Sequence, residues 1–228
     1  MNTERRIVQM NEPVLARNSN MAERNRLRFQ QHGVTAVNLV SSPGSGKTAL
    51  LERTLVDLRH ELRMAALVGD LATENDARRM RQTGAKAIQI ITGDVCHLDA
   101  DMVDRAYDQI ESEPLDILFI ENVGNLVCPA SYDLGESRRI VLLSVTEGED
   151  KPLKYPTIFR DADVVLITKS DIAAYVEYDR QTAEHNIRSI ATRATLFELS
   201  AKTGEGMEPW YGYLRALHNR HSSAGVGV

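Results

Sequence analysis

The chain has 228 residues, with 27 Lys or Arg, 32 Asp or Glu and a formal net charge of -5. This length suits one α/β domain, since domains commonly have about 100–200 residues. The basic residues are scattered, which excludes the clustered positive surface typical of a protein that binds nucleic acid. No apolar run approaches the ~20 residues that cross a membrane, and the first residues do not resemble a secretion signal. We therefore expect a soluble, cytoplasmic protein with no membrane partner.

Helical and strand-like patterns alternate along the chain. Residues 1–33 form a polar N-terminal lead-in with one helix, from Pro13 to His32. Strand-like apolar runs follow at 34–40, 64–69, 87–91, 116–121, 140–145, 163–168 and 194–199. Helical patterns occupy 48–62, 75–82, 97–111, 175–190 and 206–219. This alternation predicts one α/β domain over 34–220, with a mostly parallel sheet and helices on both faces, followed by a flexible tail at 221–228.

The first strand leads into a phosphate-binding loop, which places the domain among the P-loop NTPases. A glycine-rich turn lies between this strand and the helix from residue 48, which is the order that such a loop requires. The predicted nucleotide contacts are Gly44, Ser45, Gly46, Lys47, Thr48 and Ala49. Backbone N–H groups at a helix N-terminus favour phosphate, Lys47 is expected on the β- and γ-phosphates, and the Thr48 hydroxyl is expected on Mg²⁺. Ser41 stands where the first glycine of the usual pattern is expected.

Acidic residues follow two other predicted strands. Ligands of parallel α/β sheets bind beyond the carboxyl ends of the strands. Asp70 ends one run with Asp76 beyond it, and Glu121 ends another, three residues before Gly124. An acid at the end of an apolar strand suits a nucleotide-bound Mg²⁺. We predict a catalytic set of Lys47, Asp70, Asp76 and Glu121, with Thr48, Asp70 and Glu121 on magnesium. The N–H of Gly124 is expected to sense the γ-phosphate.

Two further strand ends resemble the guanine-recognition loops of GTPases. The segment Thr168-Lys169-Ser170-Asp171 resembles the Asn-Lys-x-Asp box, with Thr168 in place of Asn. The Asp171 carboxylate can accept hydrogen bonds from guanine N1–H and N2–H₂, whereas adenine has no such donor pair, and each such bond is worth about 1.5–3 kcal/mol. The Lys169 stem is expected along the base, and Ser200-Ala201-Lys202 resembles the loop that contacts guanine O6. The predicted nucleotides are GTP and GDP.

The two cysteines and one histidine suggest a metal site. Cys96 is followed by His97 at the start of a predicted helix, and Cys128 lies shortly after Gly124. Two thiolates and an imidazole suit Ni²⁺ or Zn²⁺. The alternative is that Cys128 is a small buried apolar side chain and that the Cys96-His97 pair is incidental. The position of Cys128 favours a metal, because movement of the γ-phosphate loop would move a ligand. Three ligands per chain leave coordination to be completed by water or a second subunit.

The chain resembles the HypB family, GTPases that assist nickel insertion into [NiFe]-hydrogenase, from about residue 14 to residue 217. The segments that carry the resemblance are Asn38–Thr48, Gly69-Asp70, Cys96–Ala100, Glu121–Pro129, Ser144–Pro156 and Ser200–Gly204. The resemblance implies a GTP-dependent homodimer with Cys96, His97 and Cys128 at the subunit interface. It also implies two partners, a HypA-type nickel chaperone and the precursor of the hydrogenase large subunit. Lys154 would reach the nucleotide of the partner subunit.

Three other functions fit part of this pattern. A urease-type nickel GTPase of the UreG family shares the phosphate and guanine loops but carries a Cys-Pro-His motif, whereas Cys96 and His97 are adjacent here. A small-molecule kinase would need an arginine clamp for its substrate and no guanine box, and Asp171 argues against it. A signalling switch would use Cys96 and Cys128 only for packing. The sequence offers no evident arginine finger, so we expect slow GTP hydrolysis in isolation.

Overall fold

The computed structural model describes residues 12–72 and 74–224. Residues 1–11 of the predicted lead-in and residues 225–228 of the predicted tail lie outside the described residues. The strands are β1 (Thr35–Ser41), β2 (Met64–Asp70), β3 (Lys86–Ile91), β4 (Ile117–Glu121), β5 (Arg138–Ser144), β6 (Val164–Thr168) and β7 (Thr195–Glu198). They form one sheet in the order β3-β2-β4-β1-β5-β6-β7, and every neighbouring pair is parallel. The predicted α/β fold is confirmed.

The helices connect the strands; several differ from the predicted ones at their ends, and the two short helices within residues 151–160 were not predicted. They are α1 (Glu12–Gln31), α2 (Lys47–Asp57), α3 (Asn75–Gln82), α4 (Ala100–Tyr107), α5 (Lys151–Lys154), α6 (Pro156–Arg160), α7 (Arg180–Ile190) and α8 (Met207–Ala224), with short 3₁₀ helices at Cys128–Ser131 and Ser170–Tyr175. The prediction that a helix starts at residue 97 was wrong. The Asp99 side chain accepts a hydrogen bond from Met102 N at 2.8 Å and so caps α4, which begins at Ala100. Helix α8 runs to Ala224, so the first four residues of the expected tail are helical.

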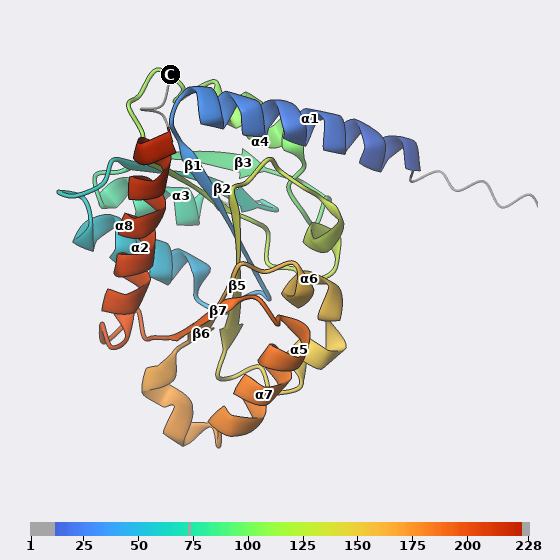
Figure 1. Ribbon diagram of the computed structural model, residues 1–228, viewed down its shortest axis with the longest axis vertical. Coiled ribbons are helices and arrows are strands. Elements are labelled where there is room, and N and C mark those ends of the chain that lie inside the picture. Colours follow the sequence, from blue (N-terminus) through green and yellow to red (C-terminus); the bar gives the residue numbers. More distant parts are fainter. Residues whose placement is uncertain (1–11, 73, 225–228) are drawn as a thin grey trace, which may run out of the picture.

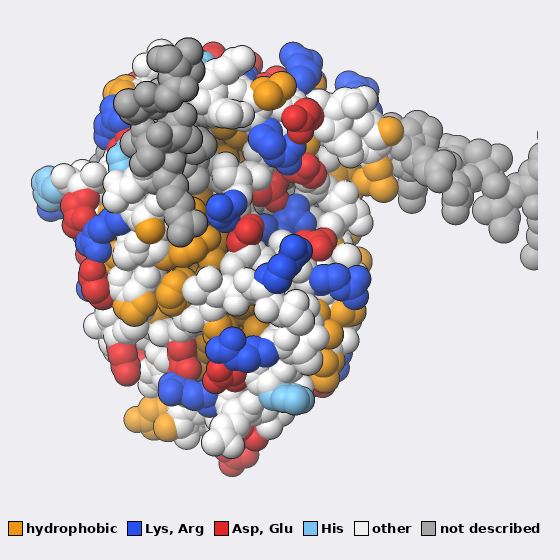
Figure 2. All heavy atoms as spheres, viewed as in Figure 1, with side chains coloured by type: hydrophobic (Ala, Val, Ile, Leu, Met, Phe, Trp, Pro, Cys, Tyr) orange, Lys and Arg blue, Asp and Glu red, His pale blue; other side chains and the backbone are white. Residues whose placement is uncertain are grey.

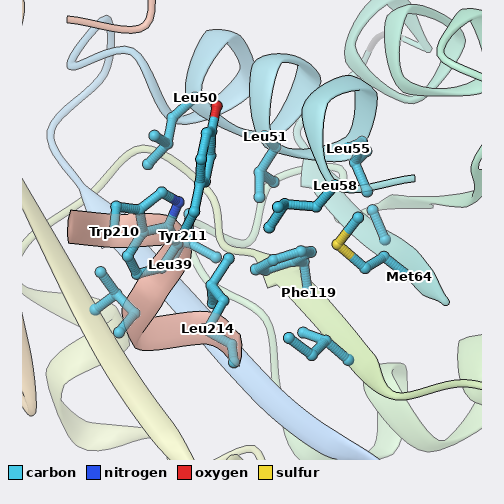
Figure 3. Close-up of a cluster of buried hydrophobic side chains, with 14 of the residues drawn as sticks. Leu39, Leu50, Leu51, Leu55, Leu58, Met64, Phe119, Trp210, Tyr211 and Leu214 are labelled. Carbon is cyan, nitrogen blue, oxygen red and sulfur yellow. The ribbon is translucent and has the colours of Figure 1, made fainter. Parts of the chain in front are cut away.

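Helices cover both faces of the sheet (Figure 1). Successive strand residues point to opposite faces, so strands buried on both sides read as continuous apolar runs. One face packs against α2, α3 and α8. The other packs against α1 and α4 over β1, β2 and β4, and against α6 and α7 over β5 and β6. Figure 3 shows Leu39 and Phe119 from the sheet facing Leu51 of α2 and Leu214 of α8.

The described surface mixes charges of both signs. On the face seen in Figure 2, Lys and Arg side chains lie among Asp and Glu side chains and do not gather by sign. Within residues 12–72 and 74–224, no helix combines the length and the apolar character that a membrane span requires. Because all seven strands are parallel, their carboxyl ends meet at one edge of the sheet. The functional residues predicted from the sequence follow these ends.

Candidate nucleotide and metal sites

The phosphate loop joins β1 to α2. Gly44 and Gly46 have positive φ angles of 73° and 96°, a conformation that suits glycine. Lys47 begins α2, its side chain is buried, and its Nζ donates a hydrogen bond to Ser41 Oγ at 2.8 Å. The serine that replaces the usual first glycine therefore holds the lysine in place. Burial lowers the pKa of Lys47, and the negative charge of Glu121 acts in the opposite direction. A phosphate beside Lys47 would stabilise its charged form.

Thr48 and Glu121 form the centre of the predicted magnesium site. Thr48 Oγ1 donates to Glu121 Oε1 at 2.8 Å. Glu121 is buried, and among the described residues its Oε2 has no hydrogen-bond partner. Burial raises the pKa of Glu121 to about 7, although the charge of Lys47 and the hydrogen bond from Thr48 act against the shift. A hydroxyl beside a carboxylate with one oxygen free is a donor set that fits Mg²⁺.

A cavity of about 420 Å³ brings most of the predicted phosphate and magnesium residues together. The predicted residues that line it are Gly44, Gly46, Lys47, Thr48, Ala49, Asp70, Asp76, Glu121 and Gly124. The side chain of Ser45 points elsewhere, since its hydroxyl hydrogen-bonds Glu147 and lies 2.9 Å from the Ser42 carbonyl oxygen. Gly124 lies directly against the phosphate loop, because a Cβ at this position would be 2.8 Å from Pro43 Cα.

Two residues at the phosphate loop and its cavity were not predicted. Arg79 of α3 lines the phosphate cavity, and its Nε donates to Glu52 Oε1 at 2.9 Å. The sequence held a signal for Arg79, because residues three apart on a helix share a face and Asp76 was already predicted at the site. Glu147 accepts from Ser144 N at 3.1 Å and forms an ion pair with Lys151 at 3.4 Å. Its hydrogen bond with Ser45 gives the 147–156 segment a role in holding the phosphate loop.

A second cavity, of about 280 Å³, contains the predicted base-recognition residues. They are Thr168, Lys169, Asp171, Ser200, Ala201 and Lys202. Gly46 and Ala49 line both cavities, so the two are neighbours, as the base and phosphates of one nucleotide require. Asp171 Oδ1 accepts from Ser200 Oγ at 2.6 Å, which orients the carboxylate.

Thr168 has a structural role in place of the expected Asn. Its Oγ1 donates to the carbonyl oxygen of Ser45 at 2.7 Å and so joins the base-recognition loop to the phosphate loop. Lys169, the next residue, has a φ of 61°, which is uncommon for a residue with a side chain. Lys154 of α5 lines neither nucleotide cavity of its own chain. It is exposed, and its Nζ lies 2.6 Å from Asp150 Oδ2.

Cys96, His97 and Cys128 come together in the folded chain, although Cys128 is 31 residues beyond His97. The two Sγ atoms are 2.6 Å apart, and one ligand atom from each of the three residues lies within 4.8 Å of the others. Cys96 and His97 belong to the loop before α4 and not to the helix itself. The His97 ring lies against the ring of Tyr132, with centroids 3.8 Å apart. Asn125 Nδ2 lies 3.4 Å from the Cys96 carbonyl oxygen, which links the segment after Gly124 to the cysteine loop.

The donor set at this cluster fits a soft or borderline divalent cation. His97 Nδ1 is buried and has no hydrogen-bond partner in the described part of the chain. Burial lowers the pKa of His97, which favours the neutral imidazole that binds metals. The hydrogen bond with Cys96 raises the pKa of the Cys128 thiol, and burial adds to this effect. A cation bound at the cluster would act in the opposite direction and lower the pKa of the Cys128 thiol, because the thiolate is the form that binds metal.

The parallel sheet and its phosphate loop define the protein as a P-loop nucleoside triphosphatase. The family model described as CobW/HypB/UreG, nucleotide-binding domain, matches residues 35–198. The chain is 50% identical over 220 residues to the hydrogenase maturation factor HypB of Rhizobium leguminosarum bv. viciae, covering 96% of this chain and 74% of that protein. The chain belongs to the CobW/HypB/UreG family and, within it, to the HypB hydrogenase maturation factors, which confirms the resemblance found in the sequence.

Two crystal structures of HypB proteins match the fold closely. The HypB of Archaeoglobus fulgidus superposes with a TM-score of 0.84 at 42% identity, covering 89% of this chain and 99% of that one. The HypB of Helicobacter pylori, in complex with nickel, has a TM-score of 0.85 at 39% identity, covering 90% and 96%.

Proposed function

We propose that the protein is a GTP-hydrolysing metallochaperone that assists nickel insertion into the large subunit of [NiFe]-hydrogenase. The observation that carries this proposal is the proximity of two sites. A cluster of two thiols and an imidazole lies on the segments that follow Glu121 and precede α4, and Gly124 of the same stretch touches the phosphate loop. The family assignment and the nickel complex of the Helicobacter pylori relative support nickel as the cargo, although the same donors would also accept Zn²⁺.

Guanine specificity is proposed from the base cavity. The Asp171 carboxylate, oriented by Ser200, would accept from both guanine donors, and Lys169 would cover the base. Ala201 and Lys202 line the same cavity, and their backbone N–H groups would contact guanine O6. Adenine would leave the carboxylate without donors, which costs free energy in a partly enclosed site.

Hydrolysis is proposed to depend on charge neutralisation at the phosphates. Lys47 would contact the β- and γ-phosphates, and Mg²⁺ would be held by Thr48, Glu121 and Asp70, directly or through water. Bound Mg²⁺ would neutralise charge that develops on the γ-phosphate. Asp70 and Asp76, which line the same cavity, are the proposed groups that orient the attacking water.

We further propose that the active form is a homodimer. Three ligands from one chain leave a tetrahedral or square-planar metal incompletely coordinated, and a second copy would supply the rest. Lys154 is exposed and away from its own nucleotide site, which suits a contact with the nucleotide of a partner subunit. A HypA-type chaperone would deliver the nickel, and the precursor of the hydrogenase large subunit would receive it.

Metal titration of single variants tests the assignment. Ni²⁺ bound by thiolates gives charge-transfer absorption, which should appear on titration of the wild type. The absorption should fall in Cys96→Ala and Cys128→Ala, and His97→Ala should weaken the affinity. His185→Ala in α7 is the matched control and should bind like the wild type. Unchanged binding in both cysteine variants would contradict the metal role and favour a switch that uses its thiols for packing.

A further inference from the structure

The metal ligands lie on two separate chain segments. The first ligand segment, residues 96–100, carries Cys96 and His97 and ends where α4 begins. The second ligand segment, residues 128–134, carries Cys128 and consists of one short 3₁₀ helix and irregular chain. Neither segment is paired in the sheet, so the strands alone do not determine the distance between them. Their relative position must come from other contacts.

Helix α1 supplies such contacts through two buried asparagines. Asn25 Nδ2 donates to the carbonyl oxygens of Ala100 and Leu134, at 2.8 and 3.1 Å. Asn18 Oδ1 accepts from Ala100 N at 2.9 Å, and its Nδ2 donates to the Asp133 carbonyl oxygen at 2.8 Å. Each asparagine therefore connects the end of the first ligand segment to the end of the second.

The spacing and the burial of these asparagines suit this role. They are seven residues apart, about two helical turns, and so lie on one face of α1. Asn18 is 7% exposed and Asn25 is 1% exposed, so water does not compete for their hydrogen bonds. The N–H of Ala100, as the first residue of α4, has no acceptor within its own helix, and Asn18 supplies one. Figure 1 shows α1 lying along α4, where these bonds form.

The backbone after the second ligand segment lies directly on α1. Gly135 has a φ of 86°, and a Cβ there would be 2.5 Å from the Ala22 carbonyl oxygen and 2.7 Å from Asn25 Cβ. Arg26 adds a two-pronged contact with Asp133, at 2.7 and 2.9 Å. The position of residues 133–135 is therefore set by close packing against α1 as well as by hydrogen bonds.

The two segments are also joined on the side of the nucleotide site. Asn122 Oδ1 accepts from Leu98 N at 3.1 Å, and Glu136 Oε2 accepts from Leu134 N at 2.8 Å. Asn38 of β1 lies between them, donating to Glu136 Oε1 at 3.1 Å and lying 3.4 Å from Asn122 Nδ2. These contacts connect the two ligand segments through Asn122, Asn38 and Glu136. Asn25 of α1 makes a second connection between the same segments.

We propose that Asn18 and Asn25 are positioning residues of the metal site, and that α1 holds Cys96 and His97 close enough to Cys128 for the three side chains to bind one cation. The inference rests on the proposed metal-binding function and adds a role for a helix that lies before residues 35–198 of the family match. Loss of either amide removes one of the two connections that α1 makes between the segments, so their relative position is less tightly fixed. Residues that orient metal ligands typically change affinity by about 10–100-fold when removed.

The test compares Asn25→Ala and Asn18→Ala with Asn186→Ala. Asn186 of α7 is the matched control, since its Nδ2 also donates to a backbone carbonyl, that of Glu149, at 2.9 Å. Zn²⁺ affinity is measured by competition with a chromogenic chelator, and Ni²⁺ binding by thiolate charge-transfer absorption. We expect Zn²⁺ affinity about tenfold or more weaker in both α1 variants and unchanged in the control. GDP affinity should be the same in all three, which checks that each is folded.

A double-variant comparison separates positioning from a general loss of structure. In the Cys128→Ala background the second segment carries no ligand, so adding Asn25→Ala should weaken Zn²⁺ binding no further. Metal affinity equal to wild type in both Asn18→Ala and Asn25→Ala would overturn the positioning role while leaving the metal function intact. A wild type that binds no metal through its thiols would overturn both. If Asn25→Ala does not fold, Asn18→Ala removes one of the two connections and decides the question alone.

Discussion

Gly124 lies so close to Pro43 that a Cβ at residue 124 would be 2.8 Å from the Cα of Pro43. The segment that leads from Glu121 to Cys128 therefore touches the phosphate loop itself. Cys128 lies four residues beyond this contact, and Asn125 between them reaches the backbone of Cys96. A shift of Gly124 on γ-phosphate binding would be transmitted to the metal ligands through this short stretch.

The first prediction concerns this contact. Gly124→Ala should displace the segment from the phosphate loop, since backbone cannot move aside as a flexible side chain can. We expect GTP affinity and hydrolysis to fall at least tenfold, with a smaller effect on GDP, because the N–H of Gly124 is proposed to contact the γ-phosphate. Gly212→Ala in α8 is the control, as nothing lies within 4 Å of a Cβ there. Equal GTP turnover by the two variants would remove Gly124 from the site.

The second prediction concerns base recognition. Asp171→Ala removes a carboxylate that would accept two hydrogen bonds from guanine, each worth about 1.5–3 kcal/mol. GTP affinity should fall by a hundredfold or more, whereas ATP affinity should change little. Asp161→Ala, at the exposed end of α6, serves as the control. Titration with fluorescent GTP and ATP analogues measures both affinities, and a wild type that binds them equally well would refute guanine specificity.

A third prediction concerns Arg79, which the sequence did not single out. Arg79 lines the phosphate cavity and its Nε donates to Glu52, so we expect its guanidinium to stabilise charge on the transferring phosphoryl group. Arg79→Ala should slow single-turnover GTP hydrolysis about tenfold. This is less than the loss of a full arginine finger would cause, because the Glu52 carboxylate partly neutralises the charge of Arg79. GDP affinity should stay within a factor of two. The neighbouring Arg78 lies outside the phosphate cavity, so Arg78→Ala should hydrolyse GTP at the wild-type rate.

A fourth prediction follows from the raised pKa of Glu121, about 7 against an ordinary 4.5. Between these values the folded protein binds a proton that the unfolded chain has lost, so stability falls as pH rises through this window. The contribution is complete below pH 4.5 and gone above about 7, with a total on the order of 3 kcal/mol. Denaturant unfolding without metal or nucleotide should show this loss in wild type. Glu121→Gln, which cannot ionise, should lack it, and parallel pH profiles would contradict the raised pKa.

The sequence predicted the strands and the loops that follow them because both have local signals. Buried parallel strands are continuous apolar runs, and the phosphate loop has a fixed spacing of Gly, Lys and Thr. The start of α4 was missed because Leu98 extends the apolar pattern backwards, whereas the Asp99 cap decides the boundary. Helices α5 and α6 have four and five residues, too few to show a helical period.

Other features depend on contacts between distant residues. Glu147 bonds to Ser45 across 102 residues, and Asn25 reaches Leu134 across 109. No local pattern marks either residue, since glutamate and asparagine are common on surfaces. The role of Asn25 is visible only once α1 packs on α4, and the role of Glu147 only once the loop after β5 packs on the phosphate loop.

The contact between Gly124 and the phosphate loop predicts that nucleotide state and metal binding are coupled. The most direct measurement is the equilibrium affinity for Ni²⁺ in the GDP-bound form and in the form bound to a non-hydrolysable GTP analogue, with oligomeric state followed by light scattering. A coupling of about 1–3 kcal/mol predicts affinities that differ by ~5–150-fold between the two forms, and the same factor must appear in nucleotide affinity with and without metal. Cys96→Ala and Cys128→Ala should abolish the difference while keeping GDP affinity. Identical Ni²⁺ affinities in the two nucleotide states would show that the metal and nucleotide sites act independently.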